Sequence, residues 1–254
     1  MKKKSVKALV LRTAGTNCDM ETVHALRICG AEPELLHLNE ILREKQKLGR
    51  YSIMVIPGGF SYGDDIAAGK ILANELKFKL GPELKEFIAK GKLLLGICNG
   101  FQVLVKTGFL PGTDPSEFMQ DATLTYNDSG RFQCEWVGIK KVNSKAKWLD
   151  KLPAEFELPI AHGEGKFVTK DKKVLKDVEE NGHVVFRYAP ANPNGSENSI
   201  AGICNSTGNV VGMMPHPERF ITKFQHPAWT RKKFGAHTPG FLFWQAAVNH
   251  AKEL

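Results

Sequence analysis

Two short segments of this chain are apolar at every position, and they constrain the fold more than any other feature. Residues 53–56 and 93–95 contain no polar side chain. A strand of this kind is stable only when both of its faces are covered, as in a parallel sheet between two layers of helices. We therefore expect an α/β fold.

The pattern along the chain divides at Gly108. Before it, strands and helices alternate; the expected strands are 5–11, 33–38, 52–56 and 92–97, and the expected helices 20–29, 66–80, 82–89 and 101–106. After it, the pattern predicts strands without long intervening helices, at 123–126, 132–142, 158–161, 183–188, 200–205 and 210–214, and then a closing helix at 239–251. This predicts a mostly parallel central sheet with helices on both faces and antiparallel additions in the second half, in one domain of residues 1–254.

Composition excludes several classes of protein. The chain has 35 Lys and Arg against 27 Asp and Glu, but the lysines between 140 and 176 alternate with apolar and acidic residues. That pattern is typical of a solvated face, so we expect no nucleic-acid partner. No segment approaches the roughly 18 apolar residues of a membrane helix, and the five cysteines form no Cys-x-x-Cys pair. We expect a cytoplasmic protein with free thiols, no membrane contact and no metal site.

The strongest local signal is Gly-x-Cys-x-Gly around Cys98, between a predicted strand and a predicted helix. This arrangement is typical of a nucleophile elbow, here with a thiol as the nucleophile. The helix N-terminus favours the thiolate, and the Asn99 N–H is placed to hold an oxyanion. The alternative is a buried structural cysteine. We accept that alternative for the other four cysteines, Cys18, Cys29, Cys134 and Cys204.

A thiolate nucleophile needs a base and a group that orients the base. Of the eight histidines, His216 has the most suggestive surroundings, Met-Met-Pro-His-Pro-Glu-Arg at 213–219. Pro217 favours an extended backbone at His216, and residues i and i+2 of an extended segment lie on the same side. Glu218 can therefore hold one imidazole nitrogen while the other faces Cys98. The alternative is a surface turn.

A glycine-rich loop follows the strand at 52–56. It reads Pro-Gly-Gly-Phe-Ser-Tyr-Gly-Asp at 57–64, and Gly58 or Gly59 can supply a second oxyanion N–H, since sites form at the carboxyl ends of parallel strands. The segment from Gly63 to Lys70 is not a phosphate-binding P-loop, because five residues separate its glycines and Ile71 follows the lysine.

Together with Ala-His-Gly-Glu-Gly at 161–165 and Asn-Pro-Asn-Gly-Ser at 192–196, these motifs closely resemble those of the glutamine amidotransferase subunits of phosphoribosylformylglycinamidine synthase. The cysteine elbow and the His-x-Glu pair alone indicate the wider class I (triad) glutamine amidotransferases. The resemblance covers nearly the whole chain. Ala14 departs from it, where the family has proline, and segments 108–120 and 222–240 are longer than in compact members.

The resemblance implies a flavodoxin-like domain that hydrolyses glutamine to glutamate and ammonia through a cysteine thioester. It implies Cys98 as nucleophile, His216 as base, Glu218 as its orienting group, and the Gly59 and Asn99 N–H groups as oxyanion donors. It places four residues at the substrate: Gln102, Gly58, His162 and Glu164. For His162 and Glu164 two alternatives to substrate binding remain, a role at a subunit interface or in an ordinary polar turn.

The resemblance also implies the partners. Ammonia would pass to a large ATP-using synthetase subunit, with a small accessory subunit in the same complex, in de novo purine biosynthesis. ATP and magnesium belong to that large subunit, and no cofactor is expected in this chain. Two alternatives stay open: a cysteine hydrolase or protease on a similar scaffold, and a non-catalytic flavodoxin-like binding module.

Overall fold

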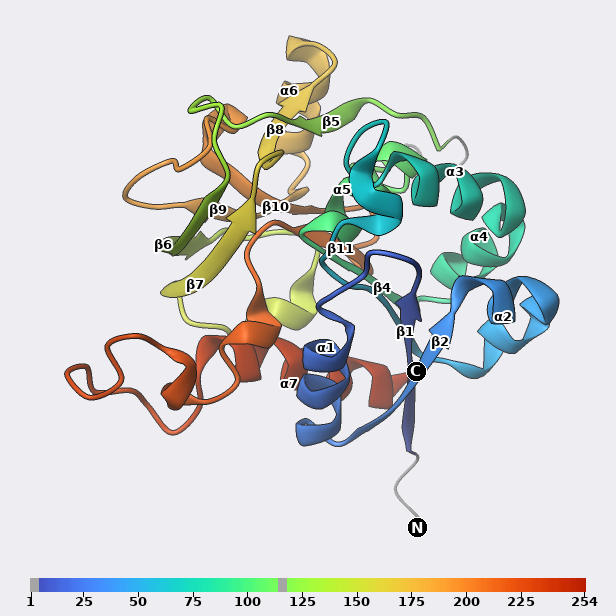
Figure 1. Cartoon of the computed structure of the whole chain (residues 1–254), viewed down its shortest axis with the longest axis horizontal. Coiled ribbons are helices and arrows are strands. Elements are labelled where there is room, and N and C mark those ends of the chain that lie inside the picture. The colour runs from blue at the N-terminus through green and yellow to red at the C-terminus, as the bar shows by residue number, and fades with distance from the viewer. Residues whose placement is uncertain (1–4, 114–117) are drawn as a thin grey trace.

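The fold is built on one mixed sheet, seen in a computed structural model that describes residues 5–113 and 118–254 (Figure 1). Nine strands lie in the order β2-β1-β3-β4-β11-β10-β9-β6-β7. The pairs from β2 to β11 are parallel, and those from β11 to β7 are antiparallel. The strands of this sheet are β1 (Val6–Arg12), β2 (Ala31–His37), β3 (Ile53–Ile56), β4 (Leu93–Ile97), β6 (Gln133–Lys141), β7 (Glu155–His162), β9 (Val184–Tyr188), β10 (Ile200–Cys204) and β11 (Val210–Met213).

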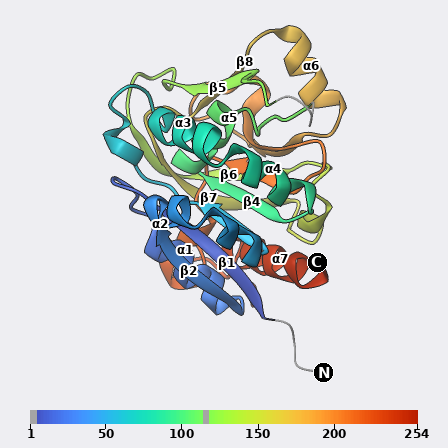
Figure 2. The ribbon, with the colours of Figure 1, turned by 90° about the vertical axis from the view of Figure 1, so that its right-hand side faces the viewer.

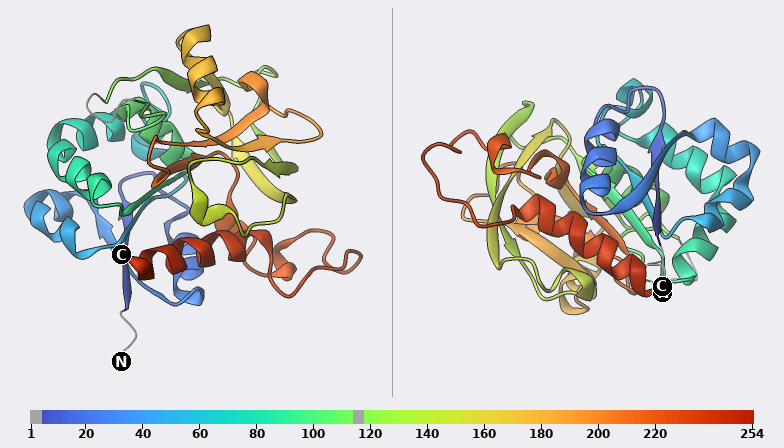
Figure 3. Two further views of the ribbon diagram at one scale, coloured as in Figure 1. Left: turned by 180° about the vertical axis from the view of Figure 1, so that it is seen from behind. Right: turned by 90° about the horizontal axis from the view of Figure 1, so that it is seen from below.

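Helices cover both faces of the sheet (Figure 2). On one face α5 packs against β3, β4 and β11, with α3 beside it; on the other, α7 lies along α1 and contacts β1 and β3 (Figure 3). The α-helices are α1 (Asp19–Ile28), α2 (Leu38–Arg43), α3 (Lys70–Lys79), α4 (Gly81–Ala89), α5 (Asn99–Thr107), α6 (Lys172–Glu180) and α7 (Pro239–Glu253). The 3-10 helices are η1 (Lys45–Arg50), η2 (Ser61–Asp64), η3 (Lys147–Leu149), η4 (Glu197–Ser199), η5 (Pro217–Arg219) and η6 (Lys223–Gln225).

The predicted α/β architecture is confirmed, including the change from parallel to antiparallel pairing in the second half. β3 and β4 are buried at every position, as their composition requires. Because β1, β3, β4 and β11 are parallel neighbours, the loops after their carboxyl ends meet at one edge of the sheet.

The start of one helix was predicted wrongly, and two elements of the second half were not predicted. The helix expected at 66–80 begins only at Lys70, because Gly69 adopts a left-handed backbone with φ 71°. After Gly108 the structure contains an unexpected helix, α6. The strand expected at 123–126 is present as β5 (Ala122–Thr125), and it pairs with an unexpected strand, β8 (Lys166–Thr169), in a separate two-stranded sheet. In α6, Val174, Leu175 and Val178 lie at helical spacing and pack against the core, so the apolar period of this helix is present in the sequence.

Within the two described ranges no helix combines the length and apolar character needed to cross a membrane. Of the segment 108–120, residues 114–117 lie outside the described part of the chain; the segment 222–238 follows η5 as an arm that projects beside α7 (Figure 1).

Candidate active site

Three reactive side chains surround Gly58 at the carboxyl edge of the sheet. A Cβ atom built on Gly58 would lie 2.8 Å from Cε1 of His216, 3.1 Å from Sγ of Cys18 and 3.4 Å from Cβ of Cys98. These residues follow β11, β1 and β4, and Gly58 itself follows β3. Glycine at this position therefore lets side chains from three different loops approach one another.

Cys98 occupies the strained turn of a nucleophile elbow. Its φ of 51° and ψ of −106° are rare for a residue with a side chain, and it caps the N-terminus of α5 directly after β4. The flanking glycines are sterically required: a Cβ on Gly96 would lie 2.5 Å from the Gly100 carbonyl oxygen, and one on Gly100 only 1.8 Å from that of Ile56. The thiol lies 3.5 Å from the carbonyl oxygen of Ala161, to which it can donate.

His216 and Glu218 form a buried pair beside this turn. Nδ1 of His216 lies 2.6 Å from Oε1 of Glu218, and their side chains are only 1% and 0% exposed. Because a carboxylate only accepts, Nδ1 carries a proton and Nε2 is left for the proton of a nucleophile. Within residues 5–113 and 118–254, Nε2 is buried without a hydrogen-bond partner.

The charges around His216 favour its protonated form. Burial by itself would lower the pKa of His216, but the negative charge of Glu218 and the interactions with Cys98 and Cys18 raise the pKa well above its ordinary value. A protonated imidazole beside Cys98 stabilises the thiolate as an ion pair. The arrangement supplies both an activated nucleophile and a proton for a leaving group.

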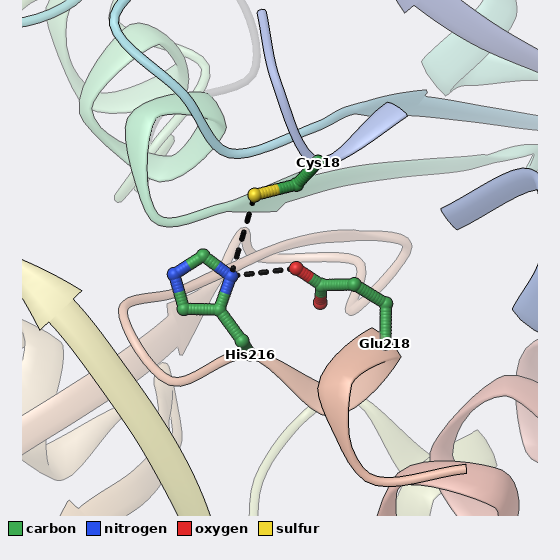
Figure 4. Close-up of side chains that lie close together, drawn as sticks. All are labelled: Cys18, His216 and Glu218. Atoms are coloured by element: carbon green, nitrogen blue, oxygen red, sulfur yellow. Dashed lines mark hydrogen bonds and ion pairs between the residues drawn. The ribbon is translucent and has the colours of Figure 1, made fainter. Parts of the chain in front are cut away.

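Cys18 is buried, as expected for a structural cysteine, but it lies beside the His216–Glu218 pair, which the sequence did not indicate. Its Sγ lies 3.9 Å from Nδ1 of His216, on the side of the ring that faces Glu218 (Figure 4). Nη2 of Arg219 donates to the same sulfur at 3.1 Å. Burial raises the pKa of Cys18, which keeps it a thiol rather than a competing nucleophile.

The glycine loop meets the first loop of the chain. Gly59 has a φ of 147°, and a Cβ there would lie 2.7 Å from the carbonyl oxygen of Gly15 and 2.8 Å from the Asn17 nitrogen. Gly58 accepts hydrogen bonds from the backbone N–H groups of Asn17 and Cys18. The loop that holds the two candidate oxyanion glycines is thus fixed by residues 15–18.

The side chain of Asn99 joins this loop to the elbow helix, a role that the sequence did not indicate. Its Oδ1 accepts from the Ser61 N–H at 3.2 Å, and its Nδ2 donates to Oδ1 of Asp64 at 3.2 Å and to Oε1 of Gln102 at 3.0 Å. Asp64 itself has a positive φ of 53°. The backbone N–H of Asn99 lies in the first turn of α5, where such groups lack helical partners and can hold an anion.

A pocket of about 220 Å³ opens at the Cys98 side chain. Gln102 lines it, and its Nε2 donates to the Glu164 carbonyl oxygen at 2.6 Å. Oε2 of Glu164 in turn accepts from the Ala68 N–H at 3.3 Å. Of the residues predicted at the substrate, the pocket lining includes Gln102, His162 and Glu164, together with the predicted oxyanion residue Gly59.

His162 is buried and held in one tautomer by Asn127, a contact that sequence reasoning missed. Nδ2 of Asn127 donates to the carbonyl oxygens of Arg131 and His162, so its Oδ1 is the atom that faces Nδ1 of His162 at 3.1 Å. That oxygen can only accept, which places the ring proton on Nδ1 and a lone pair on Nε2. Gly165 makes room for the ring, because a Cβ there would lie 2.2 Å from it.

We predict that His162 stays neutral throughout the physiological range. Burial, helped by the nearby charge of His216, lowers the pKa of His162 to about 4. Its Cε1–H resonance, assigned by its loss in His162→Gln, is expected to keep its chemical shift from about pH 8 to about pH 5, since an ordinary histidine titrates near 6.5. A resonance that moves around pH 6.5 would contradict the burial argument.

Comparisons with known proteins identify the family of this chain. Residues 5–251 match the model of the CobB/CobQ-like glutamine amidotransferase domain. The chain is 43% identical over 260 residues to phosphoribosylformylglycinamidine synthase subunit PurQ of Dehalococcoides mccartyi, covering 98% of this chain and 99% of the relative. It is 41% identical over 268 residues to the protein of the same name from Treponema denticola, covering 96% and 98% of the two chains.

A solved structure is similar over nearly the same length. The chain superposes on a chain of the structure of PurLQS from Thermotoga maritima with a TM-score of 0.75 and 33% sequence identity. The match covers 96% of this chain and 98% of that one.

Proposed function

Since this chain belongs to the family of phosphoribosylformylglycinamidine synthase PurQ subunits, which are glutamine amidotransferases, we propose that Cys98, His216 and Glu218 are its catalytic triad. Its activity is that of the glutaminase subunit of this synthase, which supplies ammonia for purine biosynthesis. The observation that carries the assignment of the triad is the buried His216–Glu218 pair beside the strained turn at Cys98.

The reaction begins with the Cys98 thiolate. It attacks the side-chain carbonyl carbon of glutamine, and the oxyanion is held by the N–H groups of Gly59 and Asn99. His216 gives its Nε2 proton to the amide nitrogen, ammonia leaves, and a thioester remains. His216 then takes a proton from water, which attacks the thioester and releases glutamate. Glu218 keeps the ring oriented and stabilises its charge throughout.

The substrate pocket is completed by residues around Gln102. We propose that Gln102, Gly58, His162 and Glu164 orient the glutamine molecule. His162 supports this role because its Nε2 offers a lone pair and it lines the same pocket as Cys98. Gln102 acts partly through its hydrogen bonds to Asn99 and Glu164, which join the elbow helix to the loop after β7.

The ammonia is consumed by another subunit. The chain acts in an assembly of the PurLQS type, with a large synthetase subunit and a small accessory subunit. We propose that ATP and magnesium are bound by the large subunit, and that this chain needs no cofactor. The sequence contains neither a P-loop nor a Gly-x-Gly-x-x-Gly motif, and this supports the assignment of ATP binding to the large subunit.

We predict that a glutamine-like electrophile labels Cys98 alone at neutral pH. Cys98 combines a helix N-terminus with a protonated base, whereas burial raises the pKa values of Cys18, Cys29 and Cys204. Peptide mass spectrometry after brief exposure provides the test. Preferential labelling of Cys18, which lies beside the same histidine, would overturn the choice of nucleophile.

A further inference from the structure

The three side chains of Figure 4 form a cluster that the glutaminase mechanism does not fully explain. Sγ of Cys18, Nδ1 of His216 and a carboxylate oxygen of Glu218 all lie within 4.8 Å of one another. All three residues are buried. The mechanism uses His216 and Glu218, but it gives no role to Cys18, whose sulfur faces the proton-bearing side of the ring.

The donor atoms are those that zinc prefers. Thiolate, imidazole and carboxylate ligands bind Zn²⁺ at about 2.0 to 2.3 Å in tetrahedral sites. Ligand atoms at such distances are separated by roughly 3.3 to 3.8 Å. The present separations from Nδ1 are 2.6 Å to Glu218 and 3.9 Å to Cys18, so an ion between them requires shifts of under about 1 Å.

The other carboxylate oxygen of Glu218 is buried without a partner. Oε2 belongs to a side chain with no exposed surface, and it has no hydrogen-bond partner among residues 5–113 and 118–254. A buried carboxylate oxygen without a partner costs free energy. A cation bound by both oxygens of Glu218 would compensate that cost.

We propose that Cys18, His216 and Glu218 form a binding site for a thiophilic divalent cation of the Zn²⁺ type, and that occupancy of this site inhibits the glutaminase. The inhibitory part rests on the proposed function of His216, whereas the binding part does not. Open coordination positions would be filled by water.

Arg219 controls entry to this site. Its Nη2 donates to Sγ of Cys18, and its Nε lies 3.2 Å from Oε2 of Glu21. The Arg219 and Glu21 side chains are 32% and 44% exposed, so the guanidinium can turn toward solvent without breaking a buried ion pair. Its positive charge selects against weakly bound cations such as Mg²⁺, which also have little affinity for sulfur.

Inhibition follows from the chemistry of the imidazole ring. A cation on Nδ1 replaces the proton that Glu218 holds there, and the remaining ring proton is then on Nε2. Such a ring cannot accept a further proton at Nε2, and a neutral ring is a poor acid toward the leaving ammonia. Binding of one ion therefore releases about two protons, one from the Cys18 thiol and one from Nδ1.

Binding can be measured without any catalytic readout. In Cys98→Ala, which removes the other thiolate that could bind zinc, calorimetric titration with Zn²⁺ in two buffers of different ionisation enthalpy should show one ion per chain and release of at least one proton, that of the Cys18 thiol. Cys98→Ala/Cys18→Ala should bind roughly 100-fold more weakly or worse, since a ligand is lost. The matched control is Cys98→Ala/Cys134→Ala, which removes an exposed thiol and should bind as Cys98→Ala does.

The outcomes separate this proposal from the proposed function. Equal Zn²⁺ affinity with and without Cys18, or no binding to Cys98→Ala, would overturn the site. If Cys18→Ala does not fold, judged by circular dichroism, Cys18→Ser serves instead, because a hydroxyl is a far weaker zinc ligand. In the chain with Cys98 present, Zn²⁺ should suppress glutamine hydrolysis and a chelator should restore it. A chain that binds Zn²⁺ through Cys18 but never hydrolyses glutamine would refute the proposed function alone.

Discussion

Cys98→Ala, assembled with the synthetase subunits, is expected to lose glutamine-dependent product formation and to keep the reaction with added ammonium salt. Removal of the nucleophile leaves no route to the thioester, so glutamine-dependent turnover should fall by at least about 10⁴-fold. The ammonia-dependent reaction occurs in another subunit and should change less than about twofold. The measurement is product formation with each nitrogen source at saturating ATP.

The control for this experiment is Cys134→Ala, which removes an exposed thiol on β6 that does not line the pocket. It should retain both reactions. Assembly of each variant with the partner subunits is checked by size-exclusion chromatography. If Cys98→Ala assembles normally and yet loses the ammonia-dependent reaction, the proposed division of labour between the subunits is wrong.

The sequence was sufficient for those features that depend on neighbouring residues. β3 and β4 are recognisable because each is apolar throughout, and the elbow because its glycines flank Cys98 within one turn. The His216–Glu218 contact joins residues i and i+2, so its geometry is local as well. In each case the chain itself brings the interacting groups together, whatever the order of the strands.

Contacts between distant parts of the chain could not be predicted in this way. Cys18 and His216 are 198 residues apart, and they meet only because β1 and β11 belong to the same parallel array, separated by β3 and β4. Asn127 and His162 are 35 residues apart: Asn127 lies in the loop after β5, whereas His162 is the last residue of β7. Periodicity in sequence indicates which strands exist, but not which loops lie side by side.

One missed element did have a local signal. The side chain of Asp171 accepts a hydrogen bond from the Val174 N–H and caps α6. An Asp at this position is a recognised helix start. The exposed lysines and glutamates of α6 are typical of a solvated face, but Val174, Leu175 and Val178 lie at helical spacing and pack against the core. The cap and the apolar period therefore both indicate this helix.

His216→Ala and Glu218→Gln are expected to differ strongly in their effects on glutamine hydrolysis. His216→Ala removes the group that donates and accepts the proton, and should reduce kcat/KM by about 10⁴-fold or more. Glu218→Gln keeps the base and an amide oxygen that can accept from Nδ1, so its loss should be smaller than that of His216→Ala by roughly 10- to 100-fold. The test is the ordering of the two variants in a glutaminase assay of the assembled complex.

The pH profile of Glu218→Gln distinguishes loss of charge from loss of structure. In the native chain the charge of Glu218 raises the pKa of His216, which keeps the imidazole protonated beside the thiolate to higher pH. Without that charge the pKa falls, so the alkaline limb of kcat/KM should move to lower pH. His24→Ala, at an exposed histidine of α1, is the control and should keep the native profile. An unshifted alkaline limb in Glu218→Gln would mean that the charge of Glu218 does not control the protonation of His216. Activity no better than that of His216→Ala would mean that Glu218 does more than orient and charge the ring.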